Sequence, residues 1–126
     1  MRIAVIGFGY IGSVISAVMC QKGFEVVAIE KNDHVVEDLN NGISNIPEPG
    51  LRELIKDSVS KGLLSGVSDY KIINTCDAIL VTVGTPLSDN YDADLTALKD
   101  VFRELSSNCI DGQIVMIKST VPPGVT

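Results

Sequence analysis

Short segments that are apolar throughout alternate along the chain with longer segments in which apolar residues recur every three or four positions. The continuous segments predict buried strands, and they lie at residues 3–6, 26–29, 71–73, 78–83 and 114–117. The periodic segments predict helices, and they lie near residues 11–23, 33–41, 51–59 and 95–105. Asn32 or Asp33 is placed to cap the second helix, and Pro49 suits the first turn of the third.

The alternation of strands and helices predicts the fold class. Strands that are apolar on both faces are typical of a parallel sheet covered by helices on each side. We therefore expect an α/β fold, a Rossmann-type doubly wound parallel sheet formed by a single domain over residues 1–126. A complete fold of this type has about six strands, so the sheet is truncated at about five. The missing strand would leave the apolar edge at residues 114–117 open to pairing.

Three glycines separate the first predicted strand from the first predicted helix. Gly7, Gly9 and Gly12 form a G-x-G-x-x-G pattern. In a dinucleotide-binding turn, the first glycine permits a tight turn, the second lets a pyrophosphate approach the backbone, and the third lets helix and strand pack closely. The free N–H groups at the start of the helix attract the phosphates. The pattern therefore predicts a cofactor-binding turn.

An acidic residue follows at the expected distance. Glu30 ends the second strand 18 residues after Gly12, near the usual spacing of ~20 for the carboxylate that binds the adenosine ribose. Its charge would repel a 2′-phosphate, so the sequence favours NAD over NADP, and the neighbouring Lys31 softens that preference. In the alternative reading, the glycines serve only a tight turn and Glu30 is a solvated strand end.

Two threonines follow later strands. Thr85 comes after the strand at 78–83, and Thr120 comes after the strand at 114–117. Ligands of open α/β sheets bind outside the carboxyl ends of the strands, so both hydroxyls are expected at the same edge as the glycine turn. They are candidates for hydrogen bonds to a cofactor ribose or phosphate, and a role in capping or turns is an equal alternative.

Charge and cysteine content limit the possible partners. Ten Lys and Arg residues against 16 Asp and Glu give a net charge of −6, which argues against nucleic acid and against an anionic membrane surface. No segment reaches the roughly 18 apolar residues that a membrane span needs. Cys20, Cys76 and Cys109 form no metal-binding pattern. A reduced, cytoplasmic setting without a bound metal is the simplest interpretation.

Several motifs in order resemble one known family. They are the segments "GFGYIG" at 7–12, "LNNG" at 39–42, "EPGL" at 48–51, "VGTP" at 83–86, "DL" at 94–95 and "KSTVPPG" at 118–124. Together they resemble the N-terminal NAD-binding domain of the UDP-glucose/GDP-mannose dehydrogenase family. The likeness covers essentially the whole chain, and "EPGL", "VGTP" and "STVPPG" are more specific than the glycine pattern.

The resemblance implies an activity and a set of cofactor contacts. Members of that family oxidise the C6 hydroxyl of a nucleotide sugar to a carboxylate by two successive hydride transfers to NAD, in the synthesis of polysaccharide precursors. The implied contacts with NAD are the glycine turn and the residues Tyr10, Ile11, Glu30, Thr85 and Thr120. Two positions depart from the family pattern, which usually has Asp at Glu30 and often has Lys at Val35.

The family's chemistry also needs a cysteine nucleophile, which the resemblance places in a later part of a typical member. Cys20, Cys76 and Cys109 are interpreted as structural, so no catalytic residue is assigned and the chain alone is expected to be inactive. In the intact enzyme, a nucleotide-sugar substrate and a homo-oligomer are expected. Two alternatives remain open: the opening domain of a hydroxyacid-type dehydrogenase, and a stand-alone dinucleotide-binding regulatory module.

Overall fold

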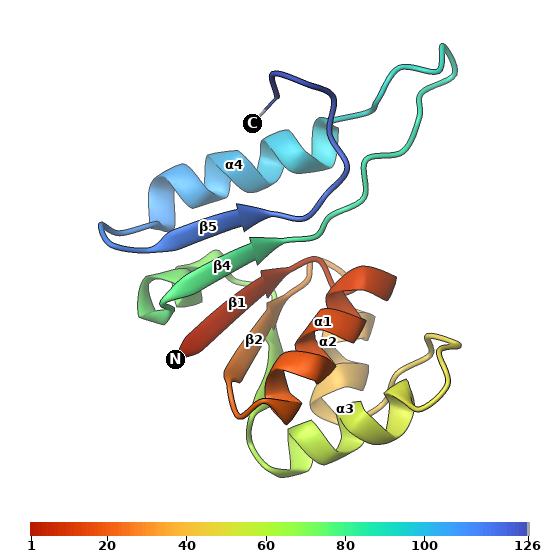
Figure 1. Cartoon of the computed structure of the whole chain (residues 1–126), viewed down its shortest axis with the longest axis vertical. Helices are drawn as coiled ribbons and strands as arrows, with labels where there is room; N and C mark the ends of the chain where they lie inside the picture. The colour runs from red at the N-terminus through yellow and green to blue at the C-terminus, as the bar shows by residue number, and fades with distance from the viewer. Residues whose placement is uncertain (126) are drawn as a thin grey trace.

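The computed structural model describes residues 1–125, which form one parallel sheet with helices on both faces (Figure 1). The strands are β1 (Arg2–Ile6), β2 (Glu25–Ile29), β3 (Leu64–Val67), β4 (Ala78–Val81) and β5 (Ile114–Ile117). The helices are α1 (Tyr10–Gln21), α2 (Asp33–Asn40), α3 (Leu51–Ser60), α4 (Thr96–Asn108) and a 3₁₀ helix, η1 (Tyr70–Thr75). The strand order β3-β2-β1-β4-β5 confirms the predicted Rossmann-type α/β class.

Alternation along β1 divides the core into two layers. Ile3 and Val5 face one cluster of buried side chains, and Ala4 and Ile6 face the other. Residues of α1, α2 and α3 complete the first cluster, whereas α4 and η1 complete the second. Helices therefore cover both faces of the sheet, which is why its inner strands are apolar throughout.

One predicted strand is wrong and one strand was not predicted. Residues 71–73 belong to η1, whose start is fixed by the Asp69 carboxylate accepting a hydrogen bond from the Lys71 N–H at 2.9 Å. The strand that was not predicted is β3, which pairs with β2 at the edge of the sheet. Gly66 in β3 lets Leu39 pack close to the strand. A Cβ at position 66 would lie only 2.8 Å from a Leu39 methyl carbon.

Helix ends follow the sequence signals with one exception. Asn32, rather than Asp33, caps α2, because its side chain accepts a hydrogen bond from the His34 N–H at 3.1 Å. Gly23, with φ +91°, ends α1 as expected. Pro49 does not lie in the first turn of α3, because the helix begins at Leu51 after Gly50, which has a left-handed backbone.

The edge strand β5 is exposed, as the sequence predicts. Ile114, Val115 and Met116 are 61%, 42% and 51% exposed. Within residues 1–125, β4 is the only strand that pairs with β5. The free edge is therefore both apolar and available for further pairing.

Candidate functional site: a cleft at the carboxyl edge of the sheet

The glycine turn joins β1 to α1 through two close contacts. Gly7 has φ +90°, a backbone conformation that residues with a side chain rarely adopt. A Cβ on Gly12 would lie 1.9 Å from the Gly7 carbonyl oxygen and 2.8 Å from the Thr82 hydroxyl oxygen. Gly7 and Gly12 are thus required by the protein's own packing, as the sequence predicts.

Gly9 differs from the other two glycines of the turn. Its φ of −84° suits any residue, and a Cβ built on it would meet no protein atom within 4 Å. The open space faces the start of α1, which has no side-chain cap within the described residues. The first N–H groups of a helix lack intrahelical partners and attract anions. The space above Gly9 is therefore open to a ligand beside the free N–H groups of α1.

Glu30 is held against the glycine turn. One oxygen of its carboxylate accepts a hydrogen bond from the Phe8 N–H at 2.9 Å, and the other accepts one from the Asn32 N–H at 3.1 Å. A carboxylate has about four lone-pair sites, so each oxygen retains a free acceptor position. Glu30 is therefore oriented by the backbone on both sides and can still accept hydroxyl donors.

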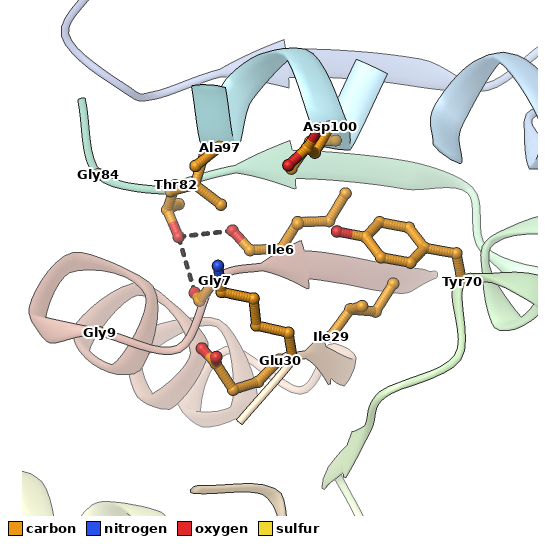
Figure 2. A pocket seen from close by; sticks show the side chains of 13 residues that line it. Ile6, Gly7, Gly9, Ile29, Glu30, Tyr70, Thr82, Gly84, Ala97 and Asp100 are labelled. Carbon is orange, nitrogen blue, oxygen red and sulfur yellow. Dashed lines mark hydrogen bonds between the residues drawn. The ribbon is translucent and has the colours of Figure 1, made fainter. Parts of the chain in front are cut away.

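A cavity of about 350 Å³ opens beside Glu30 at the carboxyl ends of the central strands (Figure 2). The predicted residues Gly7, Gly9 and Glu30 line it, together with residues that sequence reasoning did not single out as cavity-lining: Ile6, Ile29, Lys31, Tyr70, Thr82, Val83, Gly84, Ala97, Asp100 and Val101. Among the predicted residues, Tyr10, Ile11, Gly12, Thr85 and Thr120 do not line this cavity.

Thr82 fixes one wall of the cavity. Its hydroxyl lies within hydrogen-bonding distance of the Ile6 carbonyl, at 3.0 Å, and of the Gly7 carbonyl, at 2.8 Å (Figure 2). The hydroxyl donates to this pair of oxygens where β1 turns into the glycine loop. The sequence pattern predicts Thr82 inside the strand at 78–83, whereas β4 ends at Val81, and no sequence signal marked Thr82 as a cavity residue.

The two predicted threonines connect the loops that follow β4 and β5. The Thr85 hydroxyl donates a hydrogen bond to the Thr120 carbonyl at 2.5 Å. The nearby Ser119 hydroxyl donates to the Val83 carbonyl at 2.6 Å. The Thr85 side chain therefore has a role in loop structure, and its oxygen keeps acceptor capacity for a ligand.

Tyr10 and Ile11 lie at the start of α1 and are 51% and 52% exposed. The Tyr10 hydroxyl donates a hydrogen bond to the carboxylate of Glu48, in the "EPGL" segment. That hydrogen bond, followed by burial and the negative charge of Glu48, raises the pKa of Tyr10. The "EPGL" segment is thus joined directly to the glycine turn.

None of the three cysteines has the features of a reactive nucleophile. Cys20 and Cys76 are buried, and burial raises the pKa of both thiols. Cys109 is partly buried, and burial raises its pKa as well. A reactive cysteine needs a lowered pKa, so these thiols are suited to packing. Among residues 1–125, no cluster of His, Cys, Asp or Glu could hold a metal ion, and no helix could cross a membrane.

A comparison with known protein families matches residues 1–126 to the NAD binding domain of the UDP-glucose/GDP-mannose dehydrogenase family. The chain belongs to that family. Its cofactor is therefore NAD, in agreement with the open glycine turn and the oriented Glu30 carboxylate. The match favours the family over the hydroxyacid-type alternative.

Relatives of this NAD-binding domain include longer dehydrogenases. The chain is 36% identical to the GDP-mannose 6-dehydrogenase of Pseudomonas syringae pv. syringae, with 98% of the chain and 29% of the relative covered. It is 34% identical to the UDP-glucose 6-dehydrogenase YwqF of Bacillus subtilis, with 98% and 28% covered. A crystal structure of a ternary complex of GDP-mannose dehydrogenase from Pseudomonas aeruginosa has a TM-score of 0.94 and 34% identity, with 98% and 29% covered. The chain thus spans less than a third of the length of these relatives.

Proposed function

We propose that this chain is the cofactor-binding part of a nucleotide-sugar 6-dehydrogenase. NAD would accept a hydride from C6 of the sugar in each of two successive oxidations, from alcohol to aldehyde and from the hydrated or thiol-bound aldehyde to carboxylate. Each oxidation would pass one hydride, which carries two electrons, to NAD and release one proton to solvent, and water would supply the second carboxylate oxygen. The observation that carries the proposal is the open space above Gly9 beside the oriented Glu30 carboxylate.

Different residues of the cleft would bind different parts of the dinucleotide. The pyrophosphate would lie over Gly9, where the uncapped N-terminus of α1 supplies N–H donors and a partial positive charge. The ribose next to adenine would place its hydroxyls on the free acceptor sites of Glu30. Tyr10 and Ile11 would border the pyrophosphate, because they form the first turn of α1.

The remaining predicted contacts concern the other end of the cofactor. Thr85 and Thr120 would contact it from the loops after β4 and β5. Because the Thr85 hydroxyl gives its hydrogen to the Thr120 carbonyl, Thr85 would serve as an acceptor there. Glu30 would also disfavour a 2′-phosphate by charge repulsion, which makes NAD the preferred cofactor over NADP.

The substrate and the nucleophile would come from other parts of the enzyme. The thiols of Cys20, Cys76 and Cys109 have raised pKa values and do not line the cavity. We therefore propose that this chain alone binds NAD without oxidising a nucleotide sugar, and that the intact enzyme is a homo-oligomer. The choice of sugar would depend on residues outside this domain.

Calorimetric titration tests the proposal. NAD should bind the protein with a stoichiometry of one, and NADP should bind at least about tenfold more weakly because Glu30 opposes its extra phosphate. Addition of GDP-mannose or UDP-glucose with NAD should produce no NADH absorbance. Absence of NAD binding would overturn the proposed cofactor role, and NADH formation would overturn the inactivity of the isolated chain.

A further inference from the structure

Several residues that line the cavity beside Glu30 have no role in the proposed phosphate and ribose contacts. They come from the end of β2, from η1 and from α4, and include Ile29, Tyr70, Ala97, Asp100 and Val101. Ile29 and Val101 are almost completely buried and supply apolar walls. Tyr70 and Asp100 supply the two polar groups, and Figure 2 shows both side chains directed toward the cavity.

Tyr70 presents a neutral hydroxyl to this cavity. Burial, together with the negative charges of Glu104, Glu30 and Asp100, raises the pKa of Tyr70. Within the described residues, its hydroxyl makes no hydrogen bond to the protein. A half-buried hydroxyl in this position is available to a ligand as donor or acceptor.

Asp100 presents a carboxylate from α4. One of its oxygens pairs with Arg103 at 2.8 Å on the helix surface. The other oxygen has no such partner among residues 1–125. The side chain is 60% exposed and also lines the cavity. A carboxylate only accepts hydrogen bonds, so the group it suits is an N–H or O–H donor on the ligand.

We propose that Tyr70 and Asp100 recognise the adenine base, with Asp100 accepting a hydrogen bond from the exocyclic amino group at C6. This inference rests on the proposed function, because the base must follow the ribose at Glu30. The apolar walls contact the faces of the ring, and the Tyr70 hydroxyl donates to N7, which is an acceptor in both adenine and hypoxanthine. Asp100 is thereby a specificity-determining residue for the base of the cofactor.

Adenine and hypoxanthine differ at C6 and at the adjacent N1, which accepts a hydrogen bond in adenine and carries a hydrogen in hypoxanthine. The proposed contacts lie on the edge formed by C6 and N7, where only the group at C6 differs. Adenine carries an amino donor at C6, whereas hypoxanthine carries a carbonyl acceptor there. A carboxylate facing that carbonyl loses a hydrogen bond and gains repulsion between two oxygens. The Asp100 side chain is 60% exposed, so water competes for this hydrogen bond, and nicotinamide hypoxanthine dinucleotide should bind about threefold more weakly than NAD.

Titration of the protein with NAD and with nicotinamide hypoxanthine dinucleotide tests this proposal. In Asp100→Asn, the amide can donate to a carbonyl, so the preference for NAD should fall from about threefold to equal affinity or below. Tyr70→Phe should weaken both dinucleotides while it keeps the ratio. Glu53→Gln is the matched control, because it removes the same charge from an exposed side chain on α3 that does not line the cavity, and it should keep the preference.

The outcomes separate this inference from the proposed function. Tight binding of NAD together with equal affinity for the hypoxanthine analogue would overturn the role of Asp100 and leave NAD binding intact. An unchanged preference in Asp100→Asn, in a variant whose circular dichroism matches that of the wild type, would also overturn it. No binding of either dinucleotide would overturn both proposals.

Discussion

The hydroxyl of Tyr10, the first residue of α1, donates a hydrogen bond to the carboxylate of Glu48, which joins the glycine turn to the loop before α3. The contact lies between two segments that are far apart in sequence, and both are constrained locally. Pro47 and Pro49 flank Glu48 and restrict its backbone. The hydrogen bond therefore links a rigid loop to the site where a dinucleotide would approach.

Tyr10→Phe should lower the stability of the protein in a pH-dependent manner. The pKa of Tyr10 is raised in the folded state by its hydrogen bond to Glu48, so the native state holds the proton more tightly than the unfolded state. The stabilisation is present below the unfolded pKa of about 10 and is lost as pH rises through the folded pKa. Urea unfolding midpoints from pH 7 to about 11 measure the difference between the wild type and the variant.

Tyr91→Phe is the control for this prediction, because Tyr91 is 84% exposed and its hydroxyl makes no hydrogen bond within the described residues. Its midpoint should follow that of the wild type at every pH. A constant difference between Tyr10→Phe and the wild type across the whole range would show that the hydrogen bond to Glu48 does not control the ionisation of Tyr10.

Gly9→Ala should weaken NAD binding and leave the stability of the fold almost unchanged. The new methyl group meets no protein atom within 4 Å and φ is −84°, so the free energy of unfolding should change by less than about 1 kcal/mol. The same methyl group fills the space proposed for the pyrophosphate. The dissociation constant for NAD should therefore rise by about tenfold or more. Calorimetry and urea unfolding on one preparation test both statements, and wild-type affinity for NAD would contradict the proposed position of the pyrophosphate.

Gly12→Ala should give the opposite pattern. Its methyl group would lie 1.9 Å from the Gly7 carbonyl oxygen, which is backbone and cannot rotate away as a side chain can. We expect a loss of stability of about 3 kcal/mol or more, because overpacking against a fixed atom forces α1 away from β1. Thermal unfolding measures this loss. A variant as stable as Gly9→Ala would show that α1 can shift without penalty.

Glu30→Gln should weaken NAD binding and reduce its preference over NADP. The amide retains one oxygen, so either the Phe8 N–H or the Asn32 N–H loses its acceptor, and the repulsion of a 2′-phosphate disappears. We expect about a tenfold loss of NAD affinity and a smaller loss for NADP. Glu37→Gln, an exposed change on α2, should alter neither constant. An unchanged ratio of the two constants in Glu30→Gln would exclude Glu30 as the source of the preference.

The glycine turn and Glu30 were predictable because their chemistry depends on spacing within a short stretch of chain. The turn needs glycine at fixed offsets, and the acidic residue must end the next strand. Tyr70 and Asp100 gave no comparable signal. Asp100 occupies a polar position on an amphipathic helix, and only the packing of α4 over the sheet brings it to the cavity.

The error at β3 has a similar physical origin. Its sequence, Leu64–Val67, is interrupted by serine and glycine, so it lacks the apolar run of the inner strands. An edge strand pairs with a neighbouring strand on one side only, and alternate residues of β3 remain exposed. Ile72 and Ile73 are β-branched, but the hydrogen bond at Asp69 begins a 3₁₀ helix there. Local capping overrides strand propensity at that position.

Asn40→Asp tests how β3 is held at the edge of the sheet. The Asn40 amide donates to the Gly66 carbonyl at 2.9 Å, and its side-chain oxygen accepts from the Gly66 N–H at 2.8 Å. A carboxylate would keep the second hydrogen bond but set an oxygen against the carbonyl. We expect a loss of about 1–2 kcal/mol in the free energy of unfolding at pH 7, measured by urea unfolding.

The pH dependence of the same variant identifies the cause of that loss. Repulsion by the Gly66 carbonyl would raise the pKa of the new carboxyl in the folded state, so protonation restores a donor and the deficit against the wild type should shrink as pH falls toward about 4. Asn90→Asp, in an exposed loop and without a side-chain hydrogen bond among residues 1–125, should show no deficit at either pH. Protonation at about pH 4 restores only the hydrogen-bond donor to the Gly66 carbonyl. If the loss in free energy of unfolding is the same at pH 7 and at about pH 4, that donor does not hold β3 in place.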